Sequence, residues 1–192
     1  MSNSSAFTCC LIGGDTLLTQ CGEILLDQGH RILHVVTGNP AVDAWARGHG
    51  LNVVDVATDY AVTLRDTEFD YLFAITHLAM IPDEAVGSPA RMAINFHDGP
   101  LPAYAGLNTP MWALINGESD YGITWHVMAK GVDKGDILVQ HPVAIADDDT
   151  ALSLNTKCFA AALESFPTLI GQLVDGSAQP RAQDLSQRSY YG

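Results

Sequence analysis

Residues 95–108, with the sequence NFHDGPLPAYAGLN, bring together side chains that could carry out chemistry. Asn95 and His97 leave the end of a predicted strand, and because side chains alternate in direction along a strand, both lie on the same face. An Asn amide can donate a hydrogen bond to a developing oxyanion, and a His can transfer a proton near neutral pH. The pair therefore indicates an acid–base site, although a lone His more often serves as a structural hydrogen-bonding group.

A catalytic His also needs a carboxylate that orients its ring and favours its charged form. The sequence offers three candidates, Asp98, Asp133 and Asp136. Asp133 lies in GVDKGD, a loop between two predicted strands, which suits a side chain that reaches into a cleft. The prolines and glycines that follow His97 predict a rigid loop. On the residues alone, the choice among the three carboxylates stays open.

The first half of the chain predicts the elements that must position this loop. Helical spacing of apolar residues in TLLTQCGEILLDQGH predicts a helix that stops at Gly29. Alternating apolar strands and helices are typical of parallel βαβ units, so the expected fold is α/β, a Rossmann-like, mostly parallel sheet with flanking helices. In such sheets ligands bind at the carboxyl ends of the strands, where Asn95 and His97 lie. Strands are predicted at 6–12, 31–37, 51–56, 69–75 and 91–96, and a second helix at 41–48.

C-terminal strands and helices are expected in the second half. The acidic run 147–149 precedes a helix for which Asp149 or Thr150 is a natural N-cap, which favours capping over metal binding. Pro167 is predicted to begin a separate turn or helix. Residues 177–192 are polar and have no periodicity, which predicts a linker or a wrapped tail. The predicted elements are a helix at 109–117, strands at 121–128 and 136–145, and helices at 151–166 and 167–174.

The composition excludes several classes of protein. The chain has 192 residues, 47% hydrophobic and 16% charged, which is typical of one globular domain, or of one domain with a small appendage. The net charge is −13 and no cluster of Lys and Arg is present, so we expect no nucleic-acid partner. No apolar run approaches the roughly 18 residues of a membrane span, and the amino terminus lacks the basic region of a signal peptide. A cytoplasmic protein is expected.

Metal and nucleotide sites are not expected either. The four cysteines form no C-x-x-C pair and show no zinc spacing. The histidines at 97, 126 and 141 are not accompanied by a recognisable pair of acidic ligands. Gly13 and Gly14 follow a predicted strand, but GGDTLL is not G-x-G-x-x-G and no Walker lysine follows. We interpret these glycines as a tight turn between strand and helix.

A longer stretch carries a family resemblance. The segment running from LAMIPDEAVGSPARMAINFHDGPLPAYAG through TPMWALINGESDYGITWHVMAKGVDKGDILVQ resembles the core of the folate-dependent formyltransferases. These include methionyl-tRNA formyltransferase, glycinamide ribonucleotide transformylase and sugar N-formyltransferases. The shared pattern is Asn-x-His, a Leu-Pro loop with Gly, a Trp-Ala helix ending in Asn-Gly-Glu, a Gly-Ile-Thr-x-His strand and then Asp-x-Gly-Asp-Ile-Leu.

This resemblance implies 10-formyltetrahydrofolate as formyl donor and a catalytic trio of Asn95, His97 and Asp133. Asn95 would donate a hydrogen bond to the formyl oxygen and stabilise its developing charge. His97 would support the same charge and pass a proton toward the departing folate nitrogen. Asp133 would hold and polarise His97 and help to remove the proton of the attacking amine. His126 matches the family's strand His and is expected to have a structural or supporting role.

The resemblance also implies a pterin-binding site. One wall would be formed by Leu78, Ala79, Met80 and Ile81, and the other by Val132. Simple core packing is the alternative role for these apolar residues.

Departures from the family pattern bear on the acceptor. Many relatives have Ser, Leu and Arg where this chain has Gly99, Pro100 and Ala105. The loss of a cationic side chain is expected to disfavour an anionic acceptor such as a ribonucleotide phosphate. A tRNA acceptor is disfavoured by the charge of −13 and by a length that leaves no room for the further barrel of the tRNA enzyme.

Four segments are similar to the formyltransferase-like initiation domains of nonribosomal peptide synthetases and hybrid polyketide synthases: NFHDGPLPAYAGLN, ITWHVM, TALSLNTKC and QDLSQRSYYG. The resemblance implies formylation of an aminoacyl group on a carrier protein, with that carrier and adjacent synthetase domains as partners. The expected organisation is a catalytic domain over 1–176 and a tail or linker over 177–192. Two alternatives stay open: a formyltransferase for a free amine (an amino sugar, ornithine or a ribonucleotide amine), and a docking module without activity.

Overall fold

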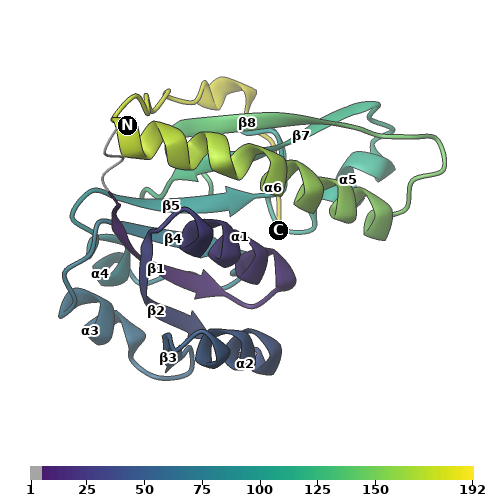
Figure 1. Ribbon diagram of the computed structural model, residues 1–192. Helices are drawn as coiled ribbons and strands as arrows, with labels where there is room; N and C mark the ends of the chain where they lie inside the picture. Colours follow the sequence, from purple (N-terminus) through teal and green to yellow (C-terminus); the bar gives the residue numbers. More distant parts are fainter. Residues whose placement is uncertain (1–5) are drawn as a thin grey trace. The chain divides into compact units, whose positions relative to one another are not determined.

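The computed structural model describes residues 6–192 (Figure 1). The chain divides into two compact units, the first ending at Asn95 and the second running from Phe96 to Gly192. None of the described helices has both the length and the apolar character needed to cross a membrane.

The first unit is built on parallel strands. The strands β1, β2, β4 and β5 pair in parallel, and β3 pairs in parallel with β2. Residues 9–13 of β1 are all buried, as expected for a strand covered on both faces. The bounds are β1 Thr8–Gly13, β2 Arg31–Thr37, β3 Asn52–Asp55, β4 Tyr71–Ile75 and β5 Met92–His97, the last of which crosses into the second unit.

The turn after β1 is as tight as the sequence indicated. A Cβ at Gly13 would lie 1.8 Å from the carbonyl oxygen of Ile75, so only glycine allows β1 and β4 to end this close together. Two residues later, the Asp15 carboxylate accepts a hydrogen bond from the Thr16 amide and caps α1. The helices of this unit are α1 Thr16–Asp27, α2 Pro40–Gly48, α3 Tyr60–Arg65 and α4 Asp83–Val86.

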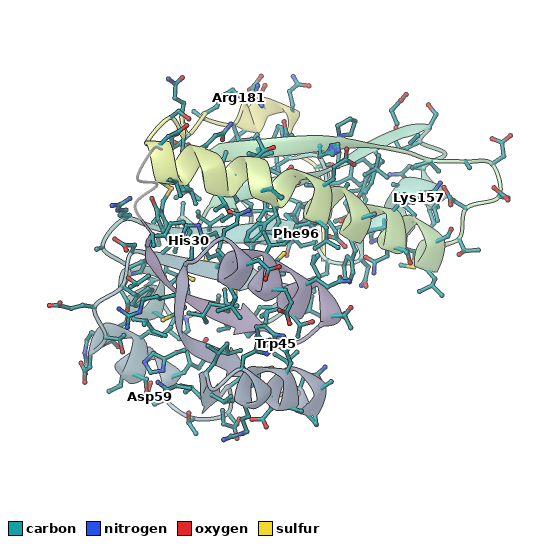
Figure 2. The ribbon with its side chains drawn as sticks, in the orientation of Figure 1. His30, Trp45, Asp59, Phe96, Lys157 and Arg181 are labelled. Carbon is teal, nitrogen blue, oxygen red and sulfur yellow. The ribbon has the colours of Figure 1, made fainter. Side chains whose placement is uncertain are left out.

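The α1–α2 contact depends on one aromatic side chain. Trp45 of α2 lies against Gly22 of α1, where a Cβ would come within 2.3 Å of the indole ring (Figure 2). The Trp45 indole N–H donates to a Glu23 carboxylate oxygen at 2.6 Å. Neither α3 nor α4 was expected from the sequence, because both are too short to show a helical period.

The second unit joins a hairpin to a long helix. Strands β7 and β8 pair antiparallel, and α6 packs on both of them (Figure 1). Phe96 contacts Trp125 of β7 and Phe159 of α6, and forms an aromatic core beneath this helix (Figure 2). The bounds are β6 Ala105–Gly106, α5 Thr109–Ile115, β7 Asp120–Val127, β8 Ile137–Ala144, α6 Ala151–Asp175, the 3-10 helix Leu185–Gln187 and β9 Tyr190–Tyr191.

Helix α6 corrects one prediction and agrees with another. Thr150 is its N-cap, and the Thr150 and Ser153 side chains form a capping box. Asp149 accepts hydrogen bonds from the Ser153 hydroxyl and the Lys157 ammonium, which agrees with a capping role for the acidic run. The expected break at Pro167 is wrong, because α6 continues through this residue to Asp175. Buried side chains on both sides of Pro167, such as Phe166 and Leu169, keep the helix packed in spite of the missing N–H.

The strand order of the whole sheet is β3-β2-β1-β4-β5-β7-β8. A seven-stranded, mostly parallel sheet flanked by helices confirms the predicted α/β class. The second sheet, β6 with β9, was not predicted. It links Ala105 to Tyr190 and Gly106 to Tyr191, so the tail is wrapped on this unit. The proposed domain boundary at residue 176 and a domain beyond residue 192 stay predictions.

Candidate active site

His97 is the last residue of β5, and its side chain is only 5% exposed. Its Nε2 lies 2.6 Å from the carbonyl oxygen of Tyr104. Because a carbonyl oxygen can only accept, Nε2 carries a proton and donates it in this hydrogen bond. The other ring nitrogen, Nδ1, lies 3.6 Å from Oδ2 of Asp133. Nδ1 is therefore the nitrogen at which His97 can gain or lose a proton.

Asp133 lies between two imidazole rings. Its Oδ2 faces His97 and accepts a hydrogen bond from the Gly106 amide at 2.9 Å, while Oδ1 lies 3.5 Å from Nε2 of His126. The Asp133 side chain is 10% exposed, and that of His126 is 3% exposed. The second nitrogen of His126, Nδ1, lies 2.9 Å from the Val127 carbonyl oxygen. The expected supporting role of His126 agrees with this arrangement.

The surroundings keep Asp133 ionised. Burial raises the pKa of this carboxyl, but the hydrogen bond from His126, the charge of His97 and the Gly106 N–H lower it, and the lowering contributions prevail, so that the pKa falls to about 2. At neutral pH, Asp133 is therefore a carboxylate that stabilises a positive charge on His97.

The other two carboxylate candidates are placed less well. Asp98 Oδ1 lies 4.0 Å from Nδ1 of His97 and accepts a hydrogen bond from the Thr109 hydroxyl at 3.0 Å. Asp136 is exposed, and its carbonyl oxygen accepts from the Val127 amide in the β7–β8 connection. Of the three, Asp133 comes closest to His97.

Asn95 lies two residues before His97 in β5 and is half-buried. The alternation of side chains along the strand puts both on one face, as the sequence predicted. Asn95 is also the register partner of Ala74 in β4, so its backbone is fixed by the parallel sheet.

The predicted pterin walls differ in exposure. In the first unit, Leu78 and Met80 follow β4 and are 81% and 74% exposed, and Ala79 between them is exposed too. Ile81 is 8% exposed, so the alternative of core packing fits this residue alone. In the second unit, Val132 is half-buried beside Asp133. The assignment of these five residues to folate binding stays a prediction.

The comparison with known proteins gives the family. Residues 52–170, more than half of the chain, match the formyl transferase family. The chain belongs to this family. The match spans β3 through most of α6 and includes Asn95, His97 and Asp133. The predicted family and enzyme class, a formyltransferase, are confirmed at this level.

Solved structures agree on the fold. A sugar 3N-formyl transferase, determined in the presence of dTDP and 5-N-formyl-THF, has a TM-score of 0.84 at 22% identity, covering 96% of this chain and 69% of that one. An N-formyltransferase from Helicobacter canadensis in complex with folinic acid and dTDP-3-aminofucose also has a TM-score of 0.84, at 20% identity, with 95% and 70% covered. Glycinamide ribonucleotide transformylase 1 from Symbiobacterium toebii has a TM-score of 0.81 at 19% identity, with 95% and 96% covered.

At two positions where this formyl transferase departs from the family pattern, the neighbouring atoms leave little space for a larger side chain. A Cβ at Gly99 would lie 2.7 Å from both Nε2 of His97 and the carbonyl oxygen of Tyr104, so a serine there would displace the hydrogen bond that fixes the ring. Ala105 is fully buried and clusters with Leu101 and Ile137. The expected preference against an anionic acceptor stays a prediction.

Several supporting residues were missed from the sequence. Tyr104 and Gly106 act through backbone groups, which residue types do not reveal. Gln183 and Arg188 of the tail bind the carbonyl oxygens of the Asp133 loop, in a segment whose composition predicted only a linker or a wrapped tail. The family pattern reaches only residue 170, so it could not point to them.

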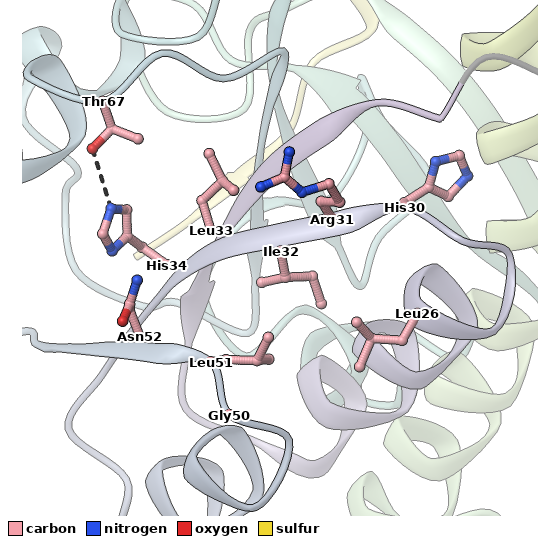
Figure 3. Close-up of a pocket in the computed structure, with 10 residues that line it drawn as sticks. All are labelled: Leu26, His30, Arg31, Ile32, Leu33, His34, Gly50, Leu51, Asn52 and Thr67. Atoms are coloured by element: carbon pink, nitrogen blue, oxygen red, sulfur yellow. Dashed lines mark hydrogen bonds between the residues drawn. The ribbon is translucent and has the colours of Figure 1, made fainter.

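A pocket of about 510 Å³ lies elsewhere, in the first unit (Figure 3). It is lined by the beginning of β2, including His34, by His30 just before this strand, and by Leu26 and Leu51. The His34 ring donates to or accepts from the Thr67 hydroxyl at 3.1 Å. None of the predicted site residues lines this pocket.

Proposed function

We propose that this chain transfers a formyl group from 10-formyltetrahydrofolate to the primary amine of a free small molecule. The observation that carries the proposal is the contact between His97 and the buried, ionised Asp133 in a member of the formyl transferase family. Two structures of similar fold hold 5-N-formyl-THF or folinic acid, which supports a folate as donor.

The residues present fit a folate. Leu78 and Met80 are large, exposed apolar side chains on the loop that follows a parallel strand. An apolar surface of this kind can pack against a planar pterin ring. When bound, 10-formyltetrahydrofolate supplies an activated formyl group on a nitrogen that can leave as a neutral amine.

The proposed mechanism divides the work among three side chains. The acceptor nitrogen forms a bond to the formyl carbon, and Asn95 donates a hydrogen bond to the oxygen that gains negative charge. The bond between the formyl carbon and the folate nitrogen then breaks. His97 in its charged form stabilises the same oxygen, and Asp133 holds that charge on the ring. The acceptor loses one proton and the departing folate nitrogen gains one, with Nδ1 of His97 as the exchange point, directly or through water.

A free small molecule is proposed as acceptor because similar structures are named as enzymes for sugars and for glycinamide ribonucleotide. An aminoacyl group on a carrier protein is the second candidate, which the resemblance to synthetase initiation domains favours.

One experiment separates these functions. The protein is incubated with 10-formyltetrahydrofolate and, in parallel, with nucleotide-linked amino sugars, glycinamide ribonucleotide, ornithine and a set of aminoacyl carrier proteins. Mass spectrometry detects the added formyl group, and absorbance detects tetrahydrofolate. Formylation of a free amine supports the proposal, and formylation of carrier-bound amines alone supports the second candidate. Binding of folinic acid in calorimetry without any transfer would favour a docking module and contradict both.

A further inference from the structure

The loop that carries Asp133 is held in an unfavourable backbone conformation. Asp133 has a φ of 51°, in the left-handed region, and Gly131 of the same loop has a φ of 95°. A left-handed conformation is sterically unfavourable for a residue with a Cβ. Conformations of this kind persist only where the surrounding structure enforces them. The contacts that enforce this one are therefore part of how Asp133 is presented to His97.

The C-terminal segment supplies such contacts. The Gln183 side-chain amide donates to the carbonyl oxygens of Asp133 and Gly135, at 2.9 and 2.6 Å. The Arg188 guanidinium donates to the carbonyl oxygen of Val132 at 3.1 Å. Three of the four carbonyl groups from residue 132 to residue 135 are thus bound by side chains from the tail.

The same segment holds the turn that fixes His97. The Tyr104 amide donates to the Ser189 hydroxyl oxygen at 2.8 Å, and the Ala105 amide donates to the Ser189 carbonyl oxygen at 3.1 Å. Tyr104 in turn offers its carbonyl to Nε2 of His97, and Gly106 offers its N–H to the carboxylate of Asp133. Residues 104–106 therefore touch both members of the catalytic pair while they are bound to the tail.

The fit between the two segments is close. A Cβ at Gly106 would lie 1.8 Å from the carbonyl oxygen of Tyr191, so β6 and β9 can pair only with glycine at this position. The ring of Tyr191 stacks between those of Tyr104 and Trp112, with centroids 5.2 and 5.0 Å apart. The tail is thus held against residues 104–106 by strand pairing and by ring stacking.

We propose that two residues of the tail position the formyl transfer site: Gln183 sets the Asp133 loop, and Ser189 sets the turn that orients His97. This inference rests on the proposed function. The tail binds backbone groups of the Asp133 loop and of residues 104–105, and it acts through the distance and direction between the Asp133 carboxylate and Nδ1 of His97.

A role in stability alone would give a different result from a role in positioning. The groups that face the Asp133 carboxylate are His97 from β5, His126 from β7 and the Gly106 N–H; Asp98 is the next charge beyond His97, and Arg188 approaches the loop from the tail. If Gln183 sets this arrangement, its loss must weaken the contacts that keep the pKa of Asp133 low. A stability role would leave that pKa unchanged in the folded protein.

The test compares Gln183→Met with Gln187→Met. Methionine keeps the length of the side chain and removes its amide donor. Gln187 is exposed and its amide reaches only Ser186, at 3.4 Å, so it is a matched control in the same segment. For Gln183→Met we expect kcat to fall by roughly 10²-fold, as for a displacement near 1 Å at a catalytic group. We also expect the acidic limb of the kcat/KM profile to move to higher pH, and Gln187→Met to match the parent protein.

A second readout does not depend on activity. The carboxyl ¹³C shift of Asp133, followed between pH 5 and 2, should titrate at higher pH in Gln183→Met than in the parent protein. An unchanged titration and pH profile in folded Gln183→Met would overturn the inference. If Gln183→Met does not fold, Ser189→Ala tests the inference by the same pH profile and the same Asp133 titration, with Ser186→Ala as its control. The proposed function fails separately, if the parent protein transfers no formyl group to any of the amines offered, and the Asp133 titration can still be followed in that case.

Discussion

His97 and Asp133 meet with an Nδ1–Oδ2 distance of 3.6 Å, although they come from positions 36 residues apart in the chain. The carbonyl of Tyr104 binds the other ring nitrogen, Nε2, and so fixes the ring with Nδ1 toward Asp133. The carboxylate is fixed by the Gly106 N–H and by His126. Predictions about activity, pH dependence and stability follow from this contact.

Removal of the His97 imidazole should abolish most of the activity. For His97→Ala we expect kcat/KM to fall by about 10² to 10⁴, the range for loss of an acid–base group. His141→Ala is the matched control, because His141 is partly exposed and its Nε2 lies 3.3 Å from a Glu164 carboxylate oxygen in the second unit. Steady-state formyl transfer is the measurement. Turnover near the parental rate in His97→Ala would refute the mechanism.

Asp133→Asn should have an effect of similar size. Asn keeps the shape of the side chain and tolerates the left-handed backbone better than other residues with a Cβ. It cannot carry the negative charge that stabilises protonated His97, so we expect kcat to fall by about 10²-fold or more. Asp136→Asn, a substitution of an exposed residue in the same connection, should leave kcat unchanged. Equal losses in both variants would show that the loop, and not the charge of Asp133, is responsible.

The stability of the protein should depend on Asp133 at acid pH. The folded-state pKa of about 2 lies below the ordinary value of 3.8, so the ionised carboxylate stabilises the fold above about pH 4 and loses this effect as the pH falls toward 2. The contribution is about 2 kcal/mol. Urea unfolding of the parent protein and of Asp133→Asn, measured at several pH values, should give a free-energy difference that shrinks between pH 4 and 2. A difference that is constant over this range would contradict the pKa assignment.

Gly99→Ala should disturb the ring of His97. The added methyl would lie 2.7 Å from Nε2 and from the Tyr104 carbonyl oxygen, so the hydrogen bond between them must lengthen. We expect the free energy of unfolding to fall by about 1–3 kcal/mol, as for other overpacked sites, and kcat to fall with it. Gly171→Ala, in α6 and without atoms near its added Cβ, should instead stabilise the protein by up to about 1 kcal/mol. Parental activity in Gly99→Ala would show that the Tyr104 contact is dispensable.

Folate affinity should respond to the loop after β4. Leu78 is 81% exposed, so Leu78→Ser should leave the melting temperature almost unchanged. If the pterin covers this side chain, the Kd for folinic acid should rise by about tenfold, which corresponds to the burial of one apolar side chain. Leu152→Ser, at a residue 76% exposed at the start of α6, is the matched control. Isothermal calorimetry measures the Kd of both variants. Equal affinities in Leu78→Ser and Leu152→Ser would show that Leu78 does not contact the folate.

Much of the fold could be predicted because its central strands are short runs of consecutive apolar residues. Residues 71–75 are all buried, and such a run of apolar residues identifies a parallel strand without any knowledge of its partners. The helix break predicted at Pro167 is wrong because the packing of α6 on the β7–β8 hairpin outweighs the local preference of proline. The two-residue strands β6 and β9 leave no periodicity at all, and only their pairing defines them.

The candidate site was predictable in part for a similar reason. Asn95 and His97 are near neighbours, so spacing alone puts them on one face. The residues left Asp98, Asp133 and Asp136 as open alternatives, and the family resemblance favoured Asp133, which is the carboxylate nearest to Nδ1 of His97. Gln183 could not be found, because its contact with Asp133 spans 50 residues and consists of a bond to a backbone carbonyl.

The pairing of the tail with residues 104–106 has a consequence for synthesis on the ribosome. Tyr104 and Ser189 are separated by 85 residues, so the Tyr104 amide has no such acceptor until nearly the whole described chain has been translated. The β7–β8 hairpin and α6 emerge earlier and can fold before that moment. A newly made chain would therefore acquire its fold first and its formyl-transferring geometry last, when residues 183–191 leave the ribosomal tunnel and dock.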